Sequence, residues 1–334
     1  MLNFTIPKEY KSLLSLRDTE VAIKKVKDHF ERQLAQKLNL TRVSAPIFVM
    51  SQSGLNDNLN GHERPVAFDA LDGANLEIVH SLAKWKRMAL GIYGFGLHEG
   101  LYTDMNAIRR DEELDNIHSM FVDQWDWELI IDKKDRTRAT LEATVNSIYD
   151  ALKNTEEYIS QEYPFIERVL PDRIEFITTQ ELEDIYPDLS PKDREYMICK
   201  EKKAVFLMQI GCRLKSGEKH DGRAPDYDDW SLNGDILVYY PILDIALELS
   251  SMGIRVDEDA LRSQLAESGC EDRVALPFHK ALLLGELPYT IGGGIGQSRM
   301  CMFFLKKAHI GEVQSSYWSE KDHEFCREKG INLL

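Results

Sequence analysis

Cysteine is scarce in this 334-residue sequence, and its spacing excludes a disulfide framework and a zinc site. The five cysteines are odd in number and widely separated, with no C-x-x-C pair and no zinc-binding spacing: Cys199, Cys212, Cys270, Cys301 and Cys326. No apolar run approaches the length of a membrane span, and residues 1–10 lack the apolar segment of a signal peptide. We therefore expect a reduced, soluble protein of the cytoplasm.

Positive charge is also in short supply. Lysine and arginine number 41 against 56 acidic residues, a net charge of −15, which disfavours a broad nucleic-acid surface because phosphate contacts need clustered cations. Basic residues gather only locally, at 84–87 and 108–110, where they bind a small anion or belong to ordinary mixed surface. Because 43% of residues are hydrophobic and no repeat or linker is present, residues 1–334 are expected to form one domain.

Hydrophobic periodicity predicts an α+β fold. Helices are expected at 19–38, 136–163, 272–285 and 297–307. Strands are expected at 75–82, 118–130, 173–179, 204–211 and 235–243, with an edge or interface strand at 42–49 around Pro46 and a loop-rich section between 82 and 118. Because the strands come in runs and do not alternate with helices, we expect a largely antiparallel sheet flanked by helices.

A glycine-rich segment at 292–296 precedes an apolar helix whose first turn contains Arg299. We expect a turn here, because glycines let the backbone approach a ligand and free amides at a helix N-terminus favour an anion. A polyphosphate is the expected ligand, and a helix-entry turn with an exposed arginine is the alternative. The segment is not a dinucleotide fingerprint, since Arg299 takes the place of the third glycine, and no Walker Gly-Lys-Ser/Thr follows.

The strand expected at 118–130 separates two kinds of side chain. Because side chains alternate along a strand, one face carries Phe121, Asp123, Trp125 and Trp127. The other face carries Val122, Gln124, Asp126 and Glu128. The second set forms either a solvated face or a surface that binds a small polar ligand through an amide and carboxylates.

Glu248 lies among apolar neighbours, where a carboxylate needs a partner. The partner is either Arg255, in a salt bridge, or a magnesium ion shared with Asp235. Polar and small residues at 250–253 predict a strand break or bulge beside a site.

Two other segments are candidates for ligand contact. The stretch 223–230 combines three acids with two aromatics and is either a lid or substrate clamp or a solvated loop. A helix after Ser81 would turn Lys86 away from Lys84 and Arg87.

Together these segments resemble one family. HSLAKWKR, GLYTDMNAIRRDE, VDQWDWE, RAPDYDDW, NGDILV, ELSSMGIRVD and IGGGIGQSR occur in the order found in ammonia-dependent asparagine synthetases (aspartate–ammonia ligases). That family is similar to the catalytic domain of class II aspartyl- and asparaginyl-tRNA synthetases. The resemblance runs from about residue 20 to residue 311 and implies their antiparallel sheet flanked by helices.

The resemblance implies a two-step ligase reaction. The side-chain carboxylate of L-aspartate attacks the α-phosphorus of ATP, which gives β-aspartyl adenylate and diphosphate. Ammonia then attacks the acyl carbon and releases L-asparagine and AMP. Activation is needed because a carboxylate is a poor acyl donor, whereas AMP leaves readily.

The resemblance also assigns residues to ligands. The positions that match the ATP site are Arg109, Asp235, Glu248, Gly294 and Arg299, with Asp235 and Glu248 as ligands of Mg²⁺. The positions that match the aspartate site are Asp57, Ser81, Lys86, Gln124, Asp126, Asp228, Ser251 and Arg255. Asp57, Arg109, Gln124, Asp228 and Arg299 are the expected catalytic residues, with Asp57 or Asp228 holding the incoming ammonium and accepting its proton.

Better-known family members carry a Gly/Ser/Pro-containing insertion between the DYDDW segment and NGD. This chain lacks it, since only Ser231 and Leu232 separate Trp230 from Asn233. A shorter lid over the adenylate is therefore expected. The family also forms homodimers through its first helix and the strand with the proline, which here are 19–38 and the Pro46 strand.

Three rival functions fit the sequence less well. A glutamine-dependent synthetase needs a nucleophilic cysteine at the processed N-terminus, where Leu2 stands, and no amidotransferase domain is expected. A tRNA synthetase needs an anticodon-binding domain, for which the core leaves little chain. A non-catalytic paralogue should lack catalytic residues that are all present here.

Overall fold

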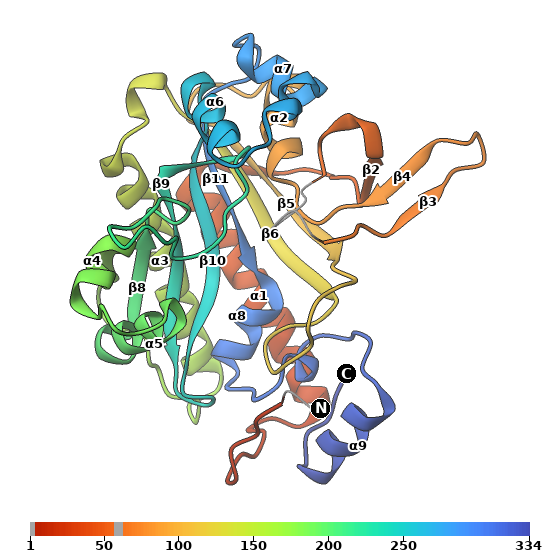
Figure 1. Ribbon diagram of the computed structural model, residues 1–334. Helices are drawn as coiled ribbons and strands as arrows, with labels where there is room; N and C mark the ends of the chain where they lie inside the picture. The colour runs from red at the N-terminus through yellow and green to blue at the C-terminus, as the bar shows by residue number, and fades with distance from the viewer. Residues whose placement is uncertain (1–3, 57–62) are drawn as a thin grey trace.

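The computed structural model describes residues 4–56 and 63–334, and eight of their strands form one sheet (Figure 1). In spatial order the strands are β1 (Leu40–Arg42), β5 (Gly100–Ile108), β6 (Phe121–Ile130), β11 (Thr290–Gly296), β10 (Ile245–Arg255), β9 (Asp228–Tyr240), β8 (Ala204–Met208) and β7 (Glu175–Thr178). Pairing is antiparallel from β5 to β8, and only the outer pairs β1–β5 and β7–β8 are parallel. The largely antiparallel sheet is thus confirmed.

A smaller sheet stands apart from this one. It orders β2 (Phe48–Met50), β4 (Asn75–Ile78) and β3 (Ala67–Asp69), and the β3–β4 hairpin extends away from the body of the molecule in Figure 1. The strand expected at 42–49 is therefore wrong as a single element, because it is divided between β1 and β2 with Pro46 in the connection.

Helices cover the large sheet on both faces. Three of them share a core with Trp125 and Trp127 of β6: α1 (Leu16–Leu38), α3 (Arg138–Glu162) and α8 (Gln297–Phe304). On the opposite face, α2 (Ala83–Ile92) packs its apolar residues against Leu101 and Ile130. The remaining α-helices of the described residues are α4 (Thr179–Ile185), α5 (Pro191–Lys202), α6 (Glu258–Glu267), α7 (Pro277–Leu283) and α9 (Glu320–Glu328). None of the described helices is both long and apolar enough to cross a membrane.

The first helix shows why local sequence predicted it well. Ser15 caps its N-terminus by accepting a hydrogen bond from the backbone N–H of Asp18, and Asn39 ends it in the left-handed region at φ 53°. Its apolar stripe is buried, and the Phe30 ring lies 4.9 Å from the ring of Trp125. Burial of that stripe against the sheet stabilises the helix beyond its intrinsic propensity.

Two predicted segments are wrong. The section between 82 and 118 is not loop-rich, since it contains α2 and the nine residues of β5. The helix expected at 272–285 is a 3₁₀ turn at Glu271–Ala275 followed by α7, because Pro277 disfavours helical backbone at the residue before it.

Candidate active site

A cavity of about 440 Å³ opens on the face of the sheet opposite Trp125 and Trp127. It is lined by most of the residues predicted for the site: Ser81, Lys86, Arg109, Gln124, Asp126, Asp228, Glu248, Ser251, Arg255, Gly294 and Arg299. Of the other two, Asp235 does not line the cavity but pairs with Arg223, which does, and Asp57 lies outside the described residues. Segments far apart in the chain thus meet at one place.

Strand β6 contributes the polar floor of this cavity. Trp125 and Trp127 are buried on the helix-covered face, as alternation predicts, while Gln124 and Asp126 line the cavity. Asp126 and the neighbouring Glu128 are 3% and 0% exposed, so the alternative of a solvated face is wrong for both. Carboxylates this deeply buried need cationic partners.

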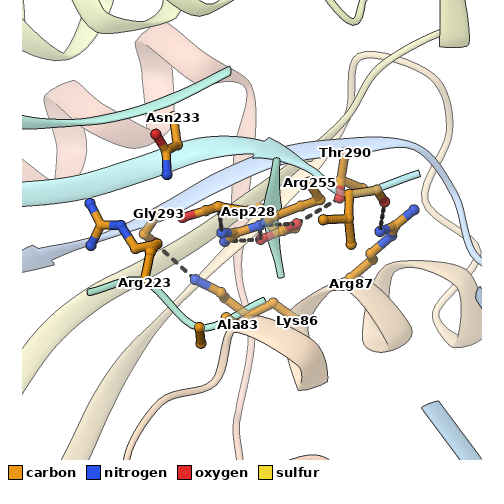
Figure 2. Close-up of polar contacts among 12 residues, drawn as sticks. Ala83, Lys86, Arg87, Arg223, Asp228, Asn233, Arg255, Thr290 and Gly293 are labelled. Carbon is orange, nitrogen blue, oxygen red and sulfur yellow. Dashed lines mark hydrogen bonds and ion pairs between the residues drawn. The ribbon is translucent and has the colours of Figure 1, made fainter. Parts of the chain in front are cut away.

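Lys86 is the partner of Asp126. It reaches from α2 to the sheet and forms an ion pair with Asp126. It also donates to the backbone carbonyl of Gly293 at 2.9 Å, and both residues are labelled in Figure 2. Burial lowers the pKa of the Lys86 ammonium. The second oxygen of Asp126, Oδ2, accepts no hydrogen bond within the described part of the chain, so it offers a buried acceptor for a ligand donor. Lys86 lines the cavity, whereas Lys84 and Arg87, which the helical spacing placed on another side of α2, do not.

Arg255 is clamped between two carboxylates. Its Nε and Nη2 donate to Glu128 at 2.9 and 2.7 Å, and its Nη1 contacts Asp228, which lies beside it in Figure 2. Burial raises the pKa of Asp228. Thr290 adds a 2.6 Å hydrogen bond to Glu128. The predicted alternative of a bridge between Arg255 and Glu248 is therefore wrong, since Arg255 pairs with Glu128 and Asp228 and Glu248 pairs with Arg299.

The glycine-rich segment is a strand and not the turn that we expected. Gly292–Gly296 continue β11 in antiparallel pairing with β6 and β10, and α8 begins at Gln297. A Cβ at Gly292 would lie 2.0 Å from Glu128 Oε2, and one at Gly294 would lie 2.4 Å from Gln124 Oε1. The glycines therefore make room for side chains of the site, in addition to exposing backbone.

The other end of the cavity gathers arginines around two acids. In the first turn of α8, Arg299 Nη1 lies 3.6 Å from Glu248 Oε2 and donates to the Glu248 carbonyl at 3.2 Å. Arg223 Nη2 pairs with Asp235 Oδ1 at 2.5 Å. Arg109 also lines the cavity, and its Nε has no hydrogen-bond partner among the described residues. This end is suited to a polyanion.

Asp235 and Glu248 fit a role as magnesium ligands on phosphate groups. Burial, reinforced by the nearby charge of Glu248, raises the pKa of Asp235 to about 7 in spite of Arg223. A bound cation would relieve that repulsion. The described residues contain no group of three or more His, Cys, Asp or Glu side chains able to hold a metal, but magnesium bound to phosphates takes only one or two carboxylates.

Strand β10 contains the predicted irregularity. Its register against β9 shifts between Glu248 and Ser250 and again between Gly253 and Arg255, although the strand is not broken. The first shift lies beside Ser251, which lines the cavity. The predicted bulge is thus confirmed as a shift of register within a continuous strand.

Some lining residues were missed from sequence. Arg223 was seen only as part of a loop, and Lys192 follows Pro191 on a helix that the pattern did not predict. His118 lines the cavity with Nδ1 2.9 Å from both oxygens of Asp115. The alternation of β6 placed Glu128 on the polar face, but its supporting role follows only from its contact with Arg255 in the folded chain.

The stretch 223–230 is only partly a loop, because β9 begins at Asp228 and runs without a break through Trp230 and Asn233. The short connection at 230–233 is thus strand, and no lid is formed there. Arg223, Ala224, Tyr227 and Asp228 all line the cavity.

Comparison with known proteins gives consistent relatives. The family model described as aspartate-ammonia ligase matches residues 17–330. An aspartate–ammonia ligase of Ruminiclostridium cellulolyticum is 65% identical over 330 residues, or 98% of each chain. One from Clostridium perfringens (strain SM101) is 66% identical over 331 residues, again 98% of each chain.

Solved structures are similar in fold at low identity. Asparaginyl-tRNA synthetase of Entamoeba histolytica, in complex with asparaginyl-adenylate, has a TM-score of 0.66 at 13% identity, over 91% of this chain and 68% of that chain. The Pyrococcus horikoshii asparaginyl-tRNA synthetase complexed with asparaginyl-adenylate has a TM-score of 0.63 at 17% identity, over 89% and 68%. The expected class II synthetase fold is thus confirmed.

Proposed function

Since this chain belongs to the aspartate–ammonia ligase family, it makes L-asparagine from L-aspartate and ammonia in an ATP-dependent reaction, and we propose that the reaction passes through β-aspartyl adenylate. The observation that carries the proposal is the division of the cavity into two ends. One presents an unfilled carboxylate oxygen of Asp126 beside Lys86 and Arg255, and the other presents Arg109 and Arg299. The first end suits an amino acid and the second a nucleotide polyphosphate.

Aspartate binds at the end formed by α2 and β6. Its α-ammonium group donates to Asp126 Oδ2, which is buried and has no other hydrogen-bond partner in the described chain. Lys86 and Arg255 supply cations for the α-carboxylate, with Gln124, Ser81 and Ser251 as polar neighbours. The side-chain carboxylate then points toward the nucleotide end.

ATP binds at the arginine-rich end, with Gly294 in the cavity wall. Arg109 and Arg299 stabilise the charge that develops on the α-phosphate as the aspartate side-chain oxygen attacks and diphosphate leaves. Asp235 and Glu248 would hold Mg²⁺, which neutralises phosphate charge when it is bound. Arg109 Nε, unpaired within the described residues, is free to turn toward a phosphate oxygen.

In the second step ammonia attacks the acyl carbon, and AMP leaves with the bonding electrons of the acyl–oxygen bond. The nucleophile must lose a proton, and Asp57 or Asp228 holds the incoming ammonium and accepts that proton. Asp228 is suited to this because burial raises the pKa of its carboxyl group, which makes the carboxylate a stronger base. Arg255 holds its carboxylate in place.

We also propose that residues 1–334 form a single catalytic domain. It acts in the cytoplasm without nucleic acid or membrane as partner, and forms a homodimer through α1 and the Pro46 region. Exposed apolar side chains at Ile47, Phe48 and Met50 support an interface near that region.

The test is to give purified protein aspartate, Mg-ATP and ammonium chloride, with glutamine replacing ammonium in a parallel reaction. We expect ammonium-dependent asparagine with stoichiometric AMP, and ATP–diphosphate exchange that requires aspartate but not ammonium. Formation of ADP in place of AMP, or absence of exchange, would contradict the adenylate.

A further inference from the structure

We infer that the helical unit Glu258–Leu283 is a template that fixes the aspartate-binding wall, residues 223–230, and that Asp226, Gln264 and His279 are positioning residues for aspartate. This inference rests on the proposed binding of aspartate beside Asp228. The unit comprises α6, the 3₁₀ turn Glu271–Ala275 and α7, which lie near α2 at one end of the sheet in Figure 1. Within the described part of the chain, no residue of this unit lines the cavity. The unit therefore cannot contact the substrate directly and acts on binding only through the wall.

Gln264 of α6 holds the backbone of the wall at three points. Its Oε1 accepts from the Trp230 N–H at 2.9 Å, and its Nε2 donates to the carbonyls of Pro225 at 3.0 Å and Asp228 at 2.9 Å. Gln264 is 6% exposed, so these bonds are sheltered from water. Both the amide donor and the amide acceptor of Gln264 are thus bonded to the segment that carries Asp228. These bonds form together only when that segment has this backbone conformation.

Asp226 anchors the same segment from its side chain. It is 0% exposed, and its Oδ2 contacts His279 Nε2 at 3.0 Å, Arg273 Nη1 at 3.0 Å and Lys84 Nζ at 3.4 Å. His279 comes from α7 and Arg273 from the 3₁₀ turn, so two of the three partners belong to the template. Lys84 comes from α2, two residues before Lys86.

Asp226 and its three partners therefore connect the two elements that carry aspartate-binding residues, because the wall bears Asp228 and α2 bears Lys86. Arg136 also connects the wall to the template, since it pairs with Asp229 at 2.8 Å and with Asp257, the N-cap of α6, at 3.2 Å. A segment with this many buried polar anchors is held in one position and does not open as a lid.

The consequence is pre-organisation of aspartate binding. Displacing Asp228 by about 1 Å relative to Lys86 would misalign two groups that must contact the same small ligand. Nucleotide binding should be affected less, because Arg109 and Arg299 lie outside the wall. Arg223, at the start of the wall, pairs with Asp235, whereas the anchors hold residues 225–230. Loss of an anchor is therefore expected to separate the KM for aspartate from the KM for ATP.

The test compares Gln264→Leu, His279→Ala and His279→Gln in the full chain. Gln264→Leu and His279→Ala should raise the KM for aspartate by about tenfold or more, with the KM for ATP changed by less than about twofold. His279→Gln, which retains a donor toward Asp226, should recover most of the affinity. Faster hydrogen exchange in 223–230 should accompany the weaker binding.

Glu156→Leu is the matched control. Glu156 is a buried acceptor on α3 that holds the backbone N–H groups of Val169 and Leu170, away from the cavity. It should lower the melting temperature with no change in either KM. If Gln264→Leu behaves like this control, the template is merely structural and the inference is overturned.

Asp228→Asn separates this inference from the proposed function. An increase in the KM for aspartate in Asp228→Asn, without one in Gln264→Leu, overturns the inference alone. No change in Asp228→Asn overturns both the placement of aspartate and the inference that rests on it.

Discussion

Replacing Gly292 by alanine would place a methyl carbon 2.0 Å from Glu128 Oε2 and 2.7 Å from Arg255 Nη2. Neither group can retreat, because both are buried in the contact between Glu128, Arg255 and Asp228. Overpacking alone costs about 1–3 kcal/mol. Separating a buried ion pair costs about 3–5 kcal/mol, because each charge is left without its partner. We therefore expect Gly292→Ala to lose about 3–5 kcal/mol of stability and most asparagine formation.

Two other glycines provide the contrast. At Gly294 an added Cβ meets Gln124 Oε1 at 2.4 Å, the end of a flexible side chain that can turn away. We expect Gly294→Ala to lose less than about 1 kcal/mol but to bind aspartate more weakly. At Gly91, in α2, the nearest atom is Pro288 Cδ at 3.7 Å, an ordinary contact. Alanine there should stabilise the helix by about 0.5–1 kcal/mol.

Urea unfolding and initial rates of asparagine formation on the same preparations would measure the series. The predicted order of stability is Gly91→Ala, wild type, Gly294→Ala and then Gly292→Ala. A Gly292→Ala protein within about 1 kcal/mol of wild type would refute the close packing of β11 against the ion pair. If Gly91→Ala weakened aspartate binding as much as Gly294→Ala does, the assignment of Gln124 to the aspartate site would be refuted.

Three further predictions can be tested together. Lys86→Met should abolish aspartate-dependent exchange, since it leaves Asp126 buried without its cation; exchange at more than about a tenth of the wild-type rate would contradict the assigned pocket. Asp57→Asn should retain exchange and lose asparagine formation, and equal loss of both would contradict its role in the ammonia step. Burial lowers the pKa of His309 to about 4, whereas unfolded histidine titrates near 6.5, so stability present above pH 6.5 is lost as the pH falls, by about 1.4 kcal/mol at pH 5.5. His309→Asn retains an acceptor for the Gly311 N–H and should flatten melting temperature between pH 7 and 5.5; a slope equal to wild type would exclude this histidine as the cause.

Local pattern predicted those features whose cause is local. The apolar stripe of α1 recurs every three or four residues, and β6 alternates between tryptophans and polar residues, so each shows its buried face without knowledge of its neighbours. The order of seven motifs identified the family, and most of the matched positions line one cavity. Local pattern failed between 82 and 118, where the glycines indicated loop but burial in the sheet makes β5 a strand.

Tertiary structure alone decided which partners the polar residues have. Glu128 and Arg255 are 127 residues apart, and their contact arises because β6 and β10 both pair with β11. The same pairing holds the glycines at 292–296 in extended backbone, although their composition favours a turn. In the sequence Asp226 is one of several acids in a loop, and only the folded chain shows that its partners are Lys84, Arg273 and His279. Sequence periodicity reports which side of an element is buried, whereas the choice of charge partner depends on elements that meet only when the chain folds.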